Sequence, residues 1–191
     1  MNPKKPHLLL LPAILLLLSS GCATTSITRT EGPPAPPSSS LTDYTQLVLL
    51  DTTLAPAYAE HEANQAAAAK IHENLVDKLK EAEPSLETAE TAEEIQSAGT
   101  KGTLLIAPVI KEIKFIGGAA RFWAGAMAGS SAVNMEVVFT DAASGEVVAR
   151  PVFYQHANAH AGAFSFGGAD NAMLIRIASL VRDYVVTYRS P

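Results

Sequence analysis

Residues 133–157 constrain the fold more than any other stretch of this chain. Over residues 133–140 apolar and polar side chains alternate, and the odd-numbered positions from 133 to 139 are all large and apolar. This period of two is typical of a strand with one buried face. The turn-forming sequence Asp-Ala-Ala-Ser-Gly follows at 141–145, and residues 146–157 return as a second strand. The segment therefore predicts a β-hairpin whose apolar face other elements must cover.

Two further strands and two helices are predicted around this hairpin. Residues 45–54 are rich in Leu, Val and Thr and predict a buried strand. Residues 103–115 predict another, and because it contains Pro108 we expect it to lie at a sheet edge or to bulge there. Helices are predicted over residues 60–80 and from Asp170 onward, where apolar residues recur at steps of three and four.

Together these elements predict an α+β fold, with a mostly antiparallel sheet of about four strands and two main helices packed on one face. The Glu-rich residues 84–98 read as a polar stretch that includes at most a short helix. We assign residues 41–191 to a single domain, because about 150 residues suffice for one hydrophobic core.

The N-terminus reads as a lipoprotein signal. Lys4 and Lys5 precede an apolar run at 8–18, which as a helix is roughly 16 Å long and too short to span a bilayer. Small residues and the only cysteine, Cys22, follow. The sequence Leu-Ser-Ser-Gly-Cys at 18–22 resembles the bacterial lipobox, which implies that residues 1–21 are a signal peptide and that Cys22 carries fatty chains.

The lipobox resemblance also implies a location and a membrane contact. Ala23 is not the Asp that commonly retains such lipoproteins in the inner membrane, so we expect lipid anchoring on the periplasmic side of the outer membrane. Residues 22–40 contain four prolines and several serines and no hydrophobic period, which predicts a flexible tether after the lipidated cysteine.

The Gly-Ala-rich residues 116–132 have three interpretations. The stretch is a close-packed crossover, or a site for a protein partner in the cell envelope, or a surface where copies of the chain or a membrane make contact through Gly125 and Gly129. A second glycine-rich segment occupies 162–168. The side chains that we predict to make interactions are Arg121, Phe122, Trp123, Met127, Phe164 and Phe166.

No catalytic, metal or cofactor pattern stands out. His156 and His160 share a strand face and His61 and His72 share a helix face, but neither pair has a third ligand at suitable spacing. Ser165 lacks the first glycine of a nucleophile elbow. We therefore predict no metal, no cofactor and no enzymatic activity.

The net charge of the chain is −5 and becomes −7 without Lys4 and Lys5, which argues against nonspecific binding of nucleic acid. A single cysteine also excludes a disulfide within the chain.

Residues 103–186 resemble the bacterial lipoprotein family catalogued as domain of unknown function 4410. The resemblance rests on a strand leading into Gly117, Gly118, Arg121 and spaced glycines, then the strand and turn that end at 145, a glycine-rich loop and a terminal helix. It implies no activity. The sequence thus predicts a non-enzymatic, lipid-anchored envelope accessory or binding module. The alternative is a subunit of an oligomeric envelope assembly or secretion complex, including a homo-oligomer.

Overall fold

The computed structural model describes residues 27–96, 101–115, 130–157 and 168–190. Two long helices, α2 (Glu62–Ala82) and α6 (Gly168–Arg189), pack against one sheet. The long strands are β4 (Thr103–Lys114) and β5 (Ala132–Asp141). The shorter elements are η1 (Leu41–Asp43), β1 (Gln46–Leu50), β2 (Thr53–Leu54), α1 (Pro56–Ala59), β3 (Glu87–Ala89), α3 (Ala92–Gln96), β6 (Val147–Ala149) and β7 (Val152–His156).

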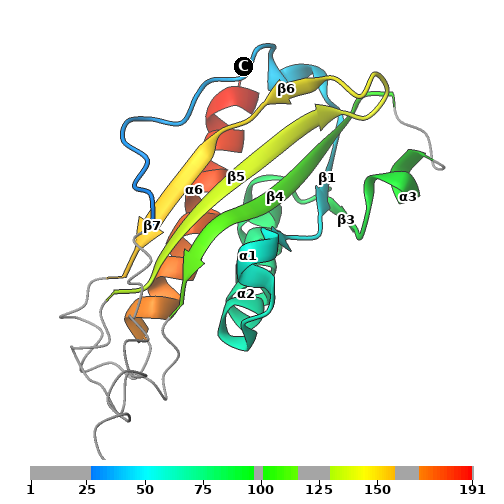
Figure 1. The fold of residues 1–191 in the computed structure, drawn as a ribbon. Helices are drawn as coiled ribbons and strands as arrows, with labels where there is room; N and C mark the ends of the chain where they lie inside the picture. The colour runs from blue at the N-terminus through cyan, green and yellow to red at the C-terminus, as the bar shows by residue number, and fades with distance from the viewer. Residues whose placement is uncertain (1–26, 97–100, 116–129, 158–167, 191) are drawn as a thin grey trace, which may run out of the picture.

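The sheet has seven strands and is mixed. Its order is β3-β1-β4-β5-β6, with β2 also paired to β4 and β7 to β5 (Figure 1). The pairs of β5 with β4, β6 and β7 are antiparallel, which confirms the predicted hairpin. The pairs that involve β1, β2 and β3 are parallel. The predicted α+β class is confirmed. The sheet is larger than the four strands expected because two predicted strands are each divided and β3, which was not predicted, adds the seventh.

The strand pairing shows where each division falls, and one of the two has a clear local cause. Residues 45–54 form β1 and β2, which pair with successive parts of β4 at Thr103–Ile106 and Val109–Ile110. Residues 146–157 form β6 and β7, which Arg150 and Pro151 separate. Proline cannot donate a ladder hydrogen bond, so a break at Pro151 is expected.

Pro108 corrects one expectation, because it lies in the central strand β4 and not at an edge. Neither β1 nor β2 supplies a partner for residues 107 and 108. The nitrogen of Pro108, which carries no hydrogen, therefore faces the break between these two strands and leaves no ladder hydrogen bond unmade. On the other side Pro108 is opposite Val137, whose own N–H donates to Pro151 O at 3.0 Å, away from β4. The ladder bulges at Lys111, between Ile110 and Glu112, and not at the proline.

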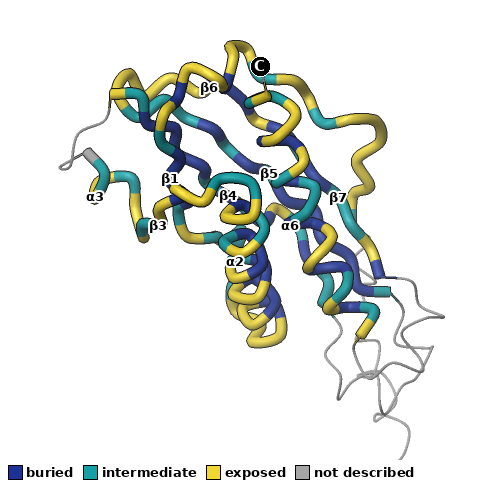
Figure 2. The backbone as a smooth tube through the Cα atoms, turned by 180° about the vertical axis from the view of Figure 1, so that it is seen from behind, coloured by how far each residue is buried: buried dark blue, intermediate teal, exposed yellow. Residues whose placement is uncertain are grey.

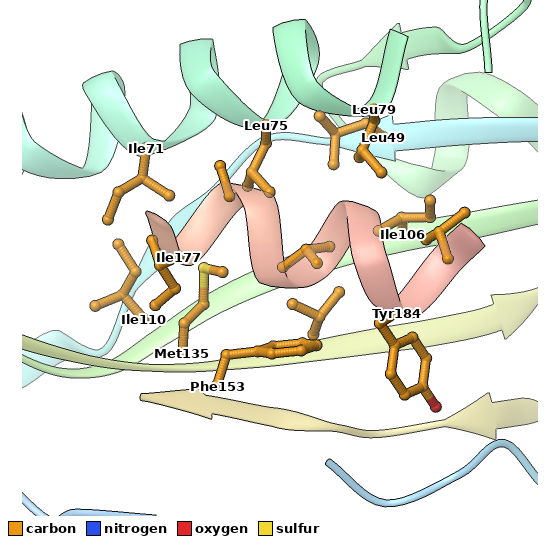
Figure 3. Close-up of a cluster of buried hydrophobic side chains, with 14 of the residues drawn as sticks. Leu49, Ile71, Leu75, Leu79, Ile106, Ile110, Met135, Phe153, Ile177 and Tyr184 are labelled. Carbon is orange, nitrogen blue, oxygen red and sulfur yellow. The ribbon is translucent and has the colours of Figure 1, made fainter. Parts of the chain in front are cut away.

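Both main helices cover the same face of the sheet (Figure 2). Ile71, Leu75 and Leu79 of α2 are buried against Leu49, Ile106 and Ile110 of the sheet (Figure 3). In α6, Ile177 and Tyr184 enter the same core, where the Tyr184 ring lies 5.4 Å from Phe139 and 5.9 Å from Phe153 between centroids. The helix faces predicted from the sequence are therefore the buried ones.

No described helix covers the opposite face of the sheet. Its side chains include Ala107, Val109, Val138 and Val152, which are all partly exposed. Among the described residues no helix has the length and apolarity that crossing a bilayer requires.

Candidate functional site

Three neighbouring strands reach the same end of the sheet, and the predicted interaction segments begin there. Lys114, the last residue of β4, pairs with Ala132, the first of β5, which in turn pairs with His156, the last of β7. We call this row the loop end. The chain leaves it after β4 for residues 116–129 and after β7 for residues 158–167.

The predicted interaction residues Arg121, Phe122, Trp123, Met127, Phe164 and Phe166 lie outside the described residues, as does Cys22. Their roles stay predictions. The fold nevertheless sets the end of β7 beside α6, at a residue eight positions after the helix begins. Arg176 of α6 donates from Nη2 to His156 O at 3.0 Å and from Nε to Gln155 Oε1 at 3.2 Å.

The N-terminal segment also reaches the loop end. Thr28 N and Oγ1 donate to the two carboxylate oxygens of Glu112 at 2.5 and 2.9 Å. Asn134, which is buried, donates from Nδ2 to Thr28 O at 3.0 Å. Three hydrogen bonds thus fix Thr28 to β4 and β5.

Further along, the same segment follows the edge of the sheet to its other end. Tyr184 Oη donates to Ala35 O at 2.9 Å, and Ser38 N donates to Val148 O of β6 at 2.8 Å. The described part of the predicted tether, residues 27–40, therefore lies along the domain (Figure 1). Only residues 23–26 separate Cys22 from this described part.

An open cavity of about 340 Å³ lies at the loop end. The row residues Lys114, Ala132 and His156 contribute to it. The full lining is Ile27, Arg29, Lys114, Ser130, Ala132, Tyr154 and His156. The Tyr154 and His156 rings stack with centroids 5.9 Å apart and an interplanar angle of 27°. The cavity thus joins two cationic side chains with a phenol, an imidazole and a hydroxyl.

The two cations of this cavity differ from Lys70, Lys78 and Arg182 on the helices. Within the described ranges, Arg29 and Lys114 form no ion pair. On the helices, by contrast, Lys70 pairs with Glu73, Lys78 with Glu81, and Arg182 with Glu81 and Asp183. The cavity therefore keeps positive charge available to a ligand.

A second cavity, of about 410 Å³, lies between α2 and the β1–β2 segment. Here His72 Nδ1 lies 3.3 Å from Thr52 Oγ1, and its Nε2 lies 3.7 Å from Asp51 Oδ1. In the part of the chain that the structure describes, no three His, Cys, Asp or Glu side chains are grouped to hold a metal ion. The His72 contacts therefore account for that side chain as a polar link between α2 and the sheet.

A family model described as a domain of unknown function, DUF4410, matches residues 36–163. The chain belongs to this family. The match starts well before the segment 103–186 that carried the sequence resemblance, and so it takes in β1, α2 and β3 as well. The DUF4410 region includes Lys114, Tyr154 and His156 of the cavity, whereas Arg29 precedes it.

Solved structures resemble this DUF4410 chain at low identity. A PelC dodecamer from Paraburkholderia phytofirmans has 11% identity and a TM-score of 0.47, with 76% of this chain and 92% of that chain covered. Protein XCC0632 from Xanthomonas campestris has 8% identity and a TM-score of 0.45, with 82% and 95% covered. A chain from Caulobacter crescentus, provisionally titled a lipoprotein, has 14% identity and a TM-score of 0.38, with 74% and 93% covered. No curated protein matches the chain.

Sequence reasoning missed the cavity of the DUF4410 chain. Its two cations are far apart in sequence, and Arg29 belongs to a segment interpreted as a tether. The alternation of Tyr154 and His156 on β7 was visible, but the pairing that sets them beside Lys114 is tertiary. The one available signal was the placement of both glycine-rich segments next to strand ends.

Proposed function

We propose that this protein is a lipoprotein of the outer membrane, anchored on the periplasmic side through Cys22, that acts as a non-enzymatic accessory or binding module. Its binding surface is the loop end of the sheet. The lipobox at residues 18–22 supports the anchor, and fatty chains on one cysteine suffice for stable attachment.

One structural observation carries the proposal: Thr28 is fixed to β4 and β5 at the loop end. Six residue steps from Cys22 to Thr28 span at most roughly 20 Å when fully extended. Anchoring at Cys22 would therefore hold the loop end close to the lipid surface. In the sequence, both glycine-rich segments follow strands that end here, and we propose that this end contacts the membrane or a protein partner in the envelope.

The test of the anchor is the mass of the full-length product isolated from cells. We expect the mature chain to begin at Cys22, to carry a diacylglyceryl group and an amide-linked acyl chain, and to fractionate with the outer membrane. The Cys22→Ser variant should keep its signal peptide and gain no lipid mass. An unmodified Cys22 in a soluble product would overturn the proposal.

A second candidate is a subunit of an oligomeric envelope assembly, which the uncovered face of the sheet favours. Ala107, Val109, Val138 and Val152 form a partly exposed apolar surface there that no described helix covers. Sedimentation of the full chain in an uncharged detergent tests this candidate. An oligomer that Val138→Lys converts to a monomer supports it, and a monomer at every concentration excludes a homo-oligomer.

A further inference from the structure

The loop-end cavity has the composition of a site for an anion with several oxygen atoms. Arg29 presents a guanidinium with five N–H donors, and Lys114 adds an ammonium group from another segment of the chain. Neither has an ionic partner among the described residues, although the chain as a whole carries a net charge of −5. Acidic residues are thus plentiful in this protein, yet they do not neutralise these two cations.

The remaining polar lining adds hydrogen-bond donors. Tyr154 and His156 are two residues apart on β7 and therefore project from the same face of the sheet, which is the face that no described helix covers. Ser130 supplies a hydroxyl beside them. The carboxylate of Glu112, the acidic group closest in sequence to Lys114, accepts two hydrogen bonds from Thr28 and forms no ion pair with Lys114 or Arg29 within the described ranges.

We infer that this cavity binds a phosphate group, with Arg29 and Lys114 as the charged contacts and Tyr154, His156 and Ser130 as hydrogen-bonding contacts. Arginine matches the geometry of phosphate oxygens with paired N–H donors, and lysine binds phosphate as a point charge. A volume of about 340 Å³ is at the lower end of small-molecule sites and has room for a phosphate together with its substituents.

The source that we assign to this phosphate is a phospholipid headgroup, and this part of the inference rests on the proposed function. With Cys22 acylated, Thr28 lies within roughly 20 Å of the anchored cysteine and Arg29, one residue further on, within roughly 25 Å. The polar headgroup layer of a bilayer is therefore within reach of the cavity. The phosphate site itself depends only on the described residues and can be tested without the anchor.

The test is calorimetric titration of the full chain, purified in an uncharged detergent, with water-soluble probes. Glycerophosphoglycerol carries the phosphodiester of an anionic headgroup, inorganic phosphate represents the free anion, and acetate controls for charge alone. We expect glycerophosphoglycerol to bind more tightly than inorganic phosphate, and acetate not to bind. Arg29→Gln and Lys114→Gln should each weaken binding about tenfold or more, since each removes a charge-assisted contact.

The matched control is Lys101→Gln. Lys101 is exposed, has no ion pair within the described ranges, and precedes the other end of β4, so the variant loses the same charge away from the cavity. It should change affinity less than about twofold, because exposed charges farther apart than a Debye length are screened. Circular dichroism of each variant, unchanged from that of the parent chain, assigns a loss of affinity to the site and not to the fold.

The outcomes separate the alternatives. Equal binding of both phosphates would keep the phosphate site and overturn the headgroup as its source. No binding of either phosphate, or an equal loss in Lys101→Gln, would overturn the site. Because the mass of Cys22 is measured separately, a failed cavity leaves the anchor intact, and an unmodified Cys22 leaves the titration valid.

Discussion

The two ends of the sheet use their polar groups in opposite ways. At the turn between β5 and β6, Asp141 Oδ1 accepts hydrogen bonds from Ala143 N at 2.9 Å, Ser144 N at 2.7 Å and Ser144 Oγ at 2.9 Å. Gly145 closes this turn with a φ of +74°, which favours glycine, and its N–H donates to Asp141 O at 2.8 Å. The turn end is thus satisfied by its own residues.

At the loop end, hydrogen bonds bring chain segments together but leave the charges unused. Thr28 is fixed by Glu112 and Asn134, while Arg29 beside it and Lys114 form no ion pair within the described ranges. Because exposed charges contribute little to stability, the role that we assign to these two cations is the proposed phosphate site and not the support of the fold. The contrast separates a stabilising end from a binding end.

The largest effect is expected where the turn end meets the core. Phe139 is fully buried, so Phe139→Ala should lower the free energy of unfolding by about 3–5 kcal/mol, because it leaves a cavity under Tyr184. Urea denaturation at neutral pH measures this. Val138→Ala is the control, since Val138 is partly exposed on the other face, and it should lower the free energy by less than about 1 kcal/mol. Equal losses would contradict the assignment of the two faces.

The next effect concerns Tyr184, whose phenol is buried beneath the N-terminal segment. Burial raises the pKa of Tyr184 to about 12, with a smaller contribution from Tyr188. The unfolded chain ionises first, near pH 10, so this stabilisation is complete below pH 10 and is lost as the pH rises toward 12. We expect about 2–3 kcal/mol to disappear over that window.

Tyr184→Phe provides the comparison for this titration. It cannot ionise, so its free energy of unfolding should fall less than that of the parent chain between pH 10 and 12. At neutral pH the variant should be about 1 kcal/mol less stable, because the hydrogen bond to Ala35 O is lost. Parallel pH curves for the two chains would show that Tyr184 is not the group responsible.

Much of this arrangement followed from the local pattern of the sequence. The three- and four-residue spacing identified the buried faces of α2 and α6, and the alternation over residues 133–140 identified β5 and its inward side. The turn at 141–145 gave the hairpin. These features depend on neighbouring residues, which is why they were predictable.

The parallel part of the sheet and the cavity depend on distant partners and were not predictable in the same way. β3 has three residues inside a Glu-rich stretch, with no apolar period to mark it as a strand. Pro108 suggested an edge, yet the break between β1 and β2 admits it at the centre. Thr28 looks like any residue of a polar linker, and only the folded chain sets it between Glu112 and Asn134.

A smaller effect is expected at Asp141, where the turn end can be opened directly. Asp141→Ala should lower the free energy of unfolding by about 1–2 kcal/mol at neutral pH, because three donors lose their acceptor in a partly exposed turn.

The Ser144 backbone N–H and hydroxyl hold the pKa of Asp141 below its usual range. The ionised carboxylate therefore stabilises the fold above about pH 4, and this contribution is lost as the pH falls through the lowered pKa. Thermal unfolding between pH 6 and pH 2 should show the two chains converging; a constant difference would mean that the carboxylate charge is not involved.

The smallest effects on stability should come from the two cations that matter most for binding. Arg29→Gln and Lys114→Gln should each change the free energy of unfolding by less than about 0.5 kcal/mol, because neither side chain has an ionic partner among the described residues. Arg189 at the turn end is the matched comparison: it pairs with Glu83 and donates to Tyr44 O at 2.8 Å, so Arg189→Gln should cost about 1–3 kcal/mol. Urea denaturation of the three variants measures the difference. If Arg29→Gln destabilised the chain as much as Arg189→Gln, Arg29 would be a structural residue. The division between a stabilising end and a binding end would then fail at Arg29, the residue on which the cavity most depends.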